Sequence, residues 1–212
     1  MTLIRDRSFY KTLLTLAVPA ALQQLISFAV NMADNVMVGS LGEVALGAVS
    51  QANRITAFLM TFVKGVSAGT AVLISQYWGK NNLPRIKRIF AVGFQVSLLI
   101  SLAFFGFAYG APRRTLALLT DNGALIEAGI PYLRLVAWSF LLYAVSENLI
   151  VMLRCVEIVR VAIVVSTASL FFNIGANYVL IFGRLGFPRL GVRGAAAATV
   201  FARFCELLIV VL

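Results

Sequence analysis

The sequence contains no histidine, only two cysteines and few charged residues. Charged side chains make up 12% of the 212 residues and hydrophobic ones 61%, and the mean hydropathy is +0.94. Soluble domains contain about 45–50% apolar residues, so a soluble fold of this length could not bury so much apolar surface. The composition therefore predicts an integral membrane protein.

These absences exclude several classes of function. Because the chain lacks histidine and Cys155 and Cys205 lie far apart, neither a metal cluster nor a disulfide framework is expected. The sequence offers no convincing nucleophile–base pair and no phosphate-binding loop, so an enzyme is not expected. The net charge is +10, but most Lys and Arg lie between apolar runs. This pattern sets membrane topology and does not predict nucleic-acid binding.

Six long apolar segments predict six membrane-spanning helices. A spanning helix needs about 20 mostly apolar residues, whereas barrel strands would alternate over segments of about ten. The connecting loops are too short to fold alone, so residues 1–212 are expected to form one all-α bundle. The predicted spans are approximately residues 12–38, 46–76, 89–111, 126–152, 160–183 and 192–212.

Loop charges predict the orientation of the bundle. The N-terminus and the second and fourth loops carry nine Lys and Arg, and the other loops carry five. Because positive charge favours the cytoplasmic side, we expect a cytoplasmic N-terminus in a prokaryotic plasma membrane, with an even number of crossings. The chain stops at Leu212 within the sixth apolar run, which suggests a fragment or one half of a larger assembly.

Two predicted helices carry polar residues along one face. The polar residues recur at i, i+3, i+7, i+10 and i+11 in the first helix, and at i, i+3, i+7 and i+11 in the fifth. Polar faces in lipid must contact protein or a water-filled cavity. The first set is Gln24, Ser27, Asn31, Asp34 and Asn35, and the second is Ser166, Ser169, Asn173 and Asn177.

Counting along the helices places several of these groups at one depth. Asp34 lies ~6–9 Å from the end of its span, and Asn177 and Thr199 lie ~9 Å from the ends of theirs. Carboxylate, carboxamide and hydroxyl oxygens in one layer suit a proton or a hard cation such as Na⁺. Interhelical hydrogen bonding alone is the alternative for Asn173, Asn177 and Thr199. An intramembrane acid such as Asp34 is itself a functional hypothesis.

Further charged residues lie inside the predicted spans. Lys64 and Glu147 lie in the second and fourth spans, at depths that helix counting separates by ~12 Å. Lys64 is expected either to snorkel or to protrude into a cavity, where it would repel a cationic substrate. Arg203 and Glu206, at i and i+3, are expected to neutralise each other. The candidate substrate or cavity residues are Gln24, Asn31, Asn35, Lys64 and Glu147.

Four stretches of the chain match a known family in order. They are VPAALQQL (18–25), MADNVMVGSLGEVALGAVS (32–50), GTAVLISQYWGKNN (69–82) and FFNIGANYVLIFGRLGFPRLGVRGAAAATVFAR (171–203). In these stretches the chain resembles the multidrug and toxic compound extrusion (MATE) family of secondary transporters. The resemblance implies twelve helices in two six-helix lobes, of which this chain would be the N-terminal lobe, with the second lobe absent.

The resemblance also implies roles for individual residues. Asp34 matches the coupling acid of the family, Asn173 and Asn177 match its polar pair on the fifth helix, and Thr199 matches a threonine of the sixth. Some members have Asp where this chain has Asn177, so its site has a single carboxylate, which weakens the case for tight Na⁺ binding. Lys64 departs from the apolar or small residue expected at its position.

The leading hypothesis is a secondary antiporter that exports cationic or amphipathic compounds in exchange for H⁺ or Na⁺. It would need no cofactor beyond the coupling ion, and its partner would be a second copy of the chain or the missing C-terminal lobe. One alternative is a lipid-linked oligosaccharide flippase of the same superfamily, which would favour a strongly cationic cavity. The other is a membrane fragment that does not transport.

Overall fold

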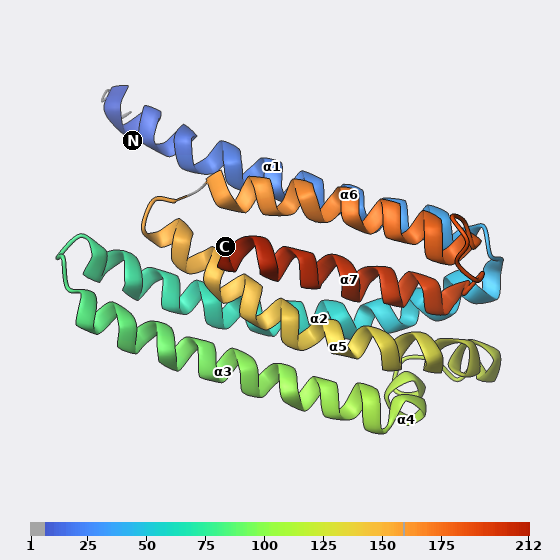
Figure 1. The fold of residues 1–212 in the computed structure, drawn as a ribbon. Helices are drawn as coiled ribbons and strands as arrows, with labels where there is room; N and C mark the ends of the chain where they lie inside the picture. Colours follow the sequence, from blue (N-terminus) through green and yellow to red (C-terminus); the bar gives the residue numbers. More distant parts are fainter. Residues whose placement is uncertain (1–6, 159) are drawn as a thin grey trace, which may run out of the picture.

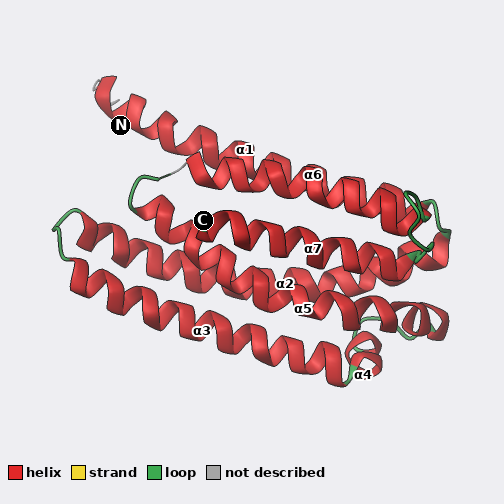
Figure 2. Cartoon of the chain, in the orientation of Figure 1, coloured by secondary structure: helices red, strands yellow, loops and turns green. Residues whose placement is uncertain are grey.

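The computed structural model describes residues 7–158 and 160–212, within which every regular element is an α-helix (Figures 1 and 2). The helices are α1 (Arg7–Gly39), α2 (Glu43–Trp78), α3 (Leu83–Gly110), α4 (Pro112–Ala117), α5 (Gly123–Cys155), α6 (Arg160–Phe182) and α7 (Val192–Val211). Among the described residues, α2, α3, α5, α6 and α7 are long and apolar enough to cross a membrane. With α1, a further helix of 33 residues, they confirm the predicted all-α architecture.

The short helix α4 differs from the prediction, which places residues 112–117 in a loop. Pro112 begins the helix, where its fixed φ suits the first turn and its missing N–H leaves no bond unmade. The Thr115 hydroxyl donates to the carbonyl of Ala111 at 2.9 Å and lies 3.0 Å from that of Phe107. Six residues are too few to show the long apolar run by which the spans were recognised.

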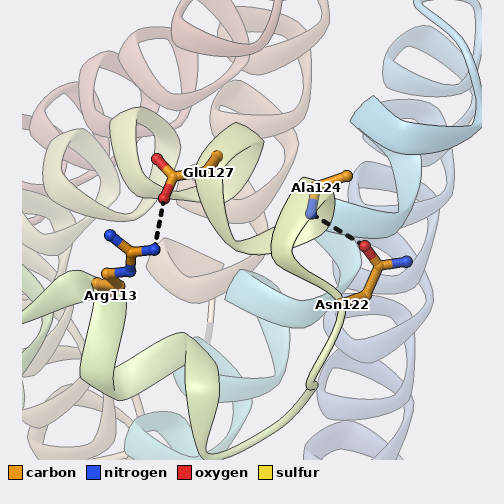
Figure 3. A network of polar contacts seen from close by, with 4 residues as sticks. All are labelled: Arg113, Asn122, Ala124 and Glu127. Carbon is orange, nitrogen blue, oxygen red and sulfur yellow. Dashed lines mark hydrogen bonds and ion pairs between the residues drawn. The ribbon is translucent and has the colours of Figure 1, made fainter.

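Most of the long helices extend beyond the predicted apolar spans, and in α3 and α5 a capping asparagine, Asn82 or Asn122, satisfies backbone groups of the first turn. The Asn122 side chain caps α5 by accepting a hydrogen bond from the backbone N–H of Ala124 at 3.0 Å (Figure 3). An exposed ion pair of 3.2 Å between Arg113 and Glu127 joins α4 to the first turns of α5 (Figure 3). These polar contacts set helix ends that hydropathy alone does not show.

The connections divide between the two ends of the bundle (Figure 1). The N-terminus, the α2–α3 loop and the α5–α6 loop lie at one end, here called the N-terminal end. The α1–α2 and α6–α7 loops and α4 lie at the opposite end. This is the alternating path that the spans predict, and it places the more basic loops at the N-terminal end. That this end faces the cytoplasm stays a prediction from the charge bias.

Helix α5 forms the centre of the bundle. Half of its most apolar stretch is buried (50%), compared with 17–33% for the other four spans, and Leu133 and Phe140 are fully buried. It packs against α2, α3 and α7, whereas α1 packs mainly against α6. The α1–α6 pair therefore lies on one side of α7, and α2, α3 and α5 lie on the other (Figure 1).

Helices α6 and α7 approach closely at Gly194. A Cβ atom at this position would lie 2.5 Å from the backbone oxygen of Leu180, so only glycine fits without separating the helices. Ala195, Ala196 and Ala198 follow it and are buried, and small residues of this kind permit close helix packing in membranes. The close contact fixes the position of Asn177, one turn before Leu180, relative to α7.

Candidate functional site

A hydrogen-bonded chain of three side chains joins α1 to α6. The Asp34 carboxylate on α1 accepts a hydrogen bond from Nδ2 of Asn177. The same Nδ2 donates to Oδ1 of Asn173, one turn earlier on α6, at 3.1 Å. Both asparagines are buried. The structure therefore brings together three of the four residues predicted to couple to an ion.

A small cavity of about 60 Å³ lies beside this carboxylate. Thr199 on α7 and Asn31 on α1 line it together with Asp34 and Asn173. The Thr199 hydroxyl donates to the carbonyl of Ala195 at 3.0 Å, which leaves its oxygen able to accept. The cavity is far smaller than the ~300–1,000 Å³ of a drug-sized site. It suits a proton, a small cation or water.

One buried oxygen at this site has no partner. The Oδ1 atom of Asn177 has no hydrogen bond in the described part of the chain. An unsatisfied buried acceptor costs about 1–3 kcal/mol, so such an atom commonly marks the place of a water molecule or an ion. Asn177 does not line the small cavity, so this oxygen reaches the cavity only if the amide turns.

Tyr132 and Asn53 are among the residues of the small cavity that are missing from the sequence-based prediction. Tyr132 on α5 is 4% exposed, and its hydroxyl donates to Oδ1 of Asn53 on α2 at 3.0 Å. The same tyrosine contacts the Thr199 side chain, and both line the small cavity with Asp34. Asn53 lies beside Arg54, near the polar start of its span, so its sequence position did not indicate that it lines a cavity. A single tyrosine in a span carries no periodic signal at all.

A larger cavity, of about 780 Å³, lies toward the N-terminal end. Lys64 on α2 and Glu147 on α5 both line it, as do Gln24 and Asn31 on α1. Lys64 therefore protrudes into a cavity, which is one of its two predicted placements. Helix counting separates its depth from that of Glu147, yet the two share this cavity and interact through charge. Asn35 is exposed and lines neither cavity.

Arg203 is one of six described residues that line both cavities. Its guanidinium forms an ion pair of 2.7 Å with Glu206, one turn later on α7, which confirms the predicted neutralisation. It also lies over the ring of Tyr143, 5.2 Å from the ring centre. Glu206 is 6% exposed, so this pair is largely shielded from solvent.

Solved structures show which class of protein has this fold. A structure described as "Crystal structure of MATE in the straight conformation" matches with a TM-score of 0.86 and 18% identity, over 97% of this chain and 46% of that one. An "Outward-facing conformation of a multidrug resistance MATE family transporter of the MOP superfamily" matches with a TM-score of 0.82 and 20% identity, over 93% and 43%. The fold is that of one lobe of a two-lobed membrane transporter.

Sequence comparison identifies the family. The MatE family model matches residues 19–179, and the chain belongs to the MATE family. The "Probable multidrug resistance protein NorM" of Bradyrhizobium diazoefficiens is 32% identical over 188 residues, which are 88% of this chain and 40% of that protein. The protein of the same name from Thermotoga maritima is 27% identical over 203 residues, 92% of this chain and 42% of that protein. The chain spans about two fifths of the length of these relatives.

Proposed function

We propose that this chain provides the ion-coupling lobe of a secondary antiporter that exports cationic or amphipathic compounds in exchange for H⁺ or Na⁺. The main support is the Asp34 carboxylate, which lies inside the bundle, hydrogen-bonded to Asn177 beside the small cavity. Intramembrane acids are costly and commonly mark ion or proton pathways. The names of the NorM relatives, which describe multidrug resistance, support the class of substrate.

In this proposal the coupling ion and the exported cation compete for one carboxylate. A charged Asp34 attracts a cationic compound and accepts the hydrogen bond of Asn177. When a proton or Na⁺ neutralises the carboxylate, the attraction for the organic cation is lost and the compound is released. Inward flow of the ion thus favours outward release of the compound. A single acid is sufficient for this exchange when one ion is carried per cycle.

The same hydrogen bond connects the charge of Asp34 to the position of α1. This helix packs mainly against α6 and much less against α2 and α7, so the contact with Asn177 is an important polar connection for it. A change in the ionisation of Asp34 changes the strength of that bond, since charge-assisted hydrogen bonds are roughly twice as strong as neutral ones. Movement of α1 relative to α6 is the expected mechanical response.

The arrangement of donors favours H⁺ over Na⁺ within this proposal. Asn177 presents an N–H group to Asp34, and a sodium ion bound there would face this donor. Na⁺ binding would require the amide to turn so that its unpaired Oδ1 joined the oxygens of Asp34 and Thr199. A proton on Asp34 requires no such turn.

The complete transport cycle requires a partner surface. One lobe alone lacks the second rigid body against which alternating access takes place, so we propose that a second lobe or a second copy completes the transporter. We place it in the plasma membrane with the N-terminus in the cytoplasm. The flippase alternative is less well supported, because the larger cavity contains acids as well as cations and is not strongly cationic.

The proposal is tested by efflux of ethidium from pump-deficient bacteria that express the 212-residue chain. Asp34→Asn should reduce the efflux rate at least about tenfold, as expected when a residue of the coupling step is lost. Asp121→Asn, a matched change at an exposed position before α5, should leave efflux unchanged at equal membrane levels. Undiminished efflux with Asp34→Asn would exclude the coupling role.

A second measurement separates the coupling role from the need for a partner. If the parent chain transports nothing while present in the membrane, the same pair of variants is compared in a tandem fusion of two copies. Efflux that appears only in the fusion, and that depends on Asp34, supports a paired arrangement. Collapsing the proton gradient or removing external Na⁺ then identifies the coupling ion.

A further inference from the structure

The larger cavity carries more positive than negative charge. Its lining includes Lys64, Arg154 and Arg203, and the acids Glu147 and Glu206. Arg203 and Glu206 form an ion pair of 2.7 Å and neutralise each other. Glu147 is then the remaining acid, and it interacts through charge with both Lys64 and Arg154. The side chains that line the cavity thus carry three cations and two carboxylates, a formal net charge of +1.

Lys64 is the cation best placed to meet a ligand. It lies about four turns before the end of α2 at Trp78, or ~21 Å along the helix axis, and so within the span. Its side chain is accessible from the cavity, and the described residues place no carboxylate within ion-pair distance of it. A charge at this depth in a membrane protein is costly unless it is paired or hydrated. A bound anion would supply the missing partner.

The rest of the cavity wall suits an apolar body. Phe28 on α1, Met60 on α2 and Val151 on α5 line it, and Ser166 and Ser169 on α6 add hydroxyl groups. Its volume of about 780 Å³ lies within the ~300–1,000 Å³ typical of sites for small molecules. An occupant of this cavity would have one charged end and an apolar remainder.

We propose that the larger cavity is a binding site for an anionic amphiphile. A carboxylate or phosphate group binds the Lys64 ammonium, and the apolar part lies against Phe28 and Met60. Glu147 opposes this binding through its own negative charge. The site thus prefers the opposite charge to the one proposed for Asp34, and it requires no transport to be detected. The anionic group can come from a lipid headgroup or from a soluble organic anion.

The test is a fluorescence titration of the purified 212-residue chain in phosphatidylcholine nanodiscs with 11-(dansylamino)undecanoate. Lys64→Gln should weaken binding about tenfold, the effect of losing one charge-assisted hydrogen bond. Lys64→Arg should stay within about threefold of the parent, since it keeps the charge. Lys87→Gln, the same change at an exposed lysine of α3 that lines neither cavity, should have no effect.

Two further measurements keep the test decisive if one variant folds poorly. Glu147→Gln should tighten binding several-fold, because it removes the opposing charge from the same cavity. The uncharged methyl ester of the probe should bind the parent more weakly and should not distinguish the parent from Lys64→Gln. The proposal is wrong if Lys64→Gln binds the anionic probe as the parent does, or if Glu147→Gln, judged folded by circular dichroism, weakens binding.

Lipid composition distinguishes the two sources of the anion. Nanodiscs in which about a third of the lipid is phosphatidylglycerol supply a competing phosphate headgroup at matched ionic strength. If the natural occupant is a lipid, the difference between the parent and Lys64→Gln should largely disappear in these discs. If it is a soluble organic anion, the difference should persist.

Discussion

The two cavities of this bundle share a wall but differ in how their charges are held. In the small cavity one carboxylate, that of Asp34, is hydrogen-bonded to a neutral amide. In the larger one the charged residues occur in both signs and face one another, and Arg203 lines both cavities. The comparison suggests a division of roles. A lone acid beside amides remains free to respond to an ion, whereas the larger cavity sets three cations against two acids.

The two cavities differ in their residues although the same helices line them. Each cavity draws residues from α1, α2, α5, α6 and α7, so the same helices line both. What changes along the axis is which residue each helix presents. Near the opposite end α6 presents Asn173 to the small cavity, while toward the N-terminal end it presents Ser166 to the larger one. Changing single residues at one level should therefore alter one cavity and spare the other.

The largest expected effect comes from removing the ion pair between Arg203, which lines both cavities, and Glu206. Arg203→Gln leaves Glu206 largely buried without its partner and should reduce the free energy of unfolding by about 3 kcal/mol, as expected for breaking a buried ion pair. Unfolding of the purified chain in detergent, followed by circular dichroism, measures the loss. The double variant Arg203→Gln with Glu206→Gln should recover most of it. A double variant as unstable as the single one would show that the ion pair is not the cause.

The next effect would make the small cavity resemble a two-acid site. Asn177→Asp places a second carboxylate beside Asp34 and should lower the Na⁺ concentration for half-maximal efflux by about tenfold, because added ligand charge strengthens cation binding. Asn35→Asp is the matched control, since Asn35 lies on α1 next to Asp34 and lines neither cavity. Unchanged Na⁺ dependence in Asn177→Asp would give Asn177 a purely structural role.

A smaller effect is expected where neither cavity is touched. Asn122→Ala removes the side chain that caps α5 and should reduce the free energy of unfolding by about 1 kcal/mol, a typical value for an N-cap. Denaturation of the purified variant measures this, and efflux per folded molecule should match the parent. Altered ion dependence in this variant would mean that the end of α5 is coupled to the small cavity.

The smallest effect should come from the exposed ion pair between α4 and α5. Arg113→Ala removes a contact whose two side chains are 75% and 60% exposed, and exposed pairs contribute only about 0–1 kcal/mol. Its unfolding transition should be nearly that of the parent and should respond weakly to added salt. A loss comparable to that of Arg203→Gln would contradict the contrast drawn between shielded and exposed charges.

Much of the fold could be predicted because apolar length alone selects spanning helices. The helix ends were harder to predict from the sequence, since they depend on single capping side chains such as Asn122. The contact of Asp34 with Asn177 was predictable because helical spacing fixes the face of each residue and counting fixes its depth. The contact between Asn53 and Tyr132 was not predictable, because it depends on how α2 packs against α5. Counting separates Lys64 from Glu147 in depth, but it could not show that both side chains line one wide cavity.

The hydrogen bond between Asp34 and Asn177 joins residues that are 143 positions apart in the sequence. At about 5–20 residues per second of synthesis, the ribosome needs roughly 7–30 s to make the segment between them. Throughout that interval the Asp34 carboxylate has been made and its amide partner does not yet exist. Biogenesis of this lobe must therefore shelter an unpaired acid, by water at the membrane surface or by the insertion machinery. The contact between α1 and α6 forms only after α6 has been made.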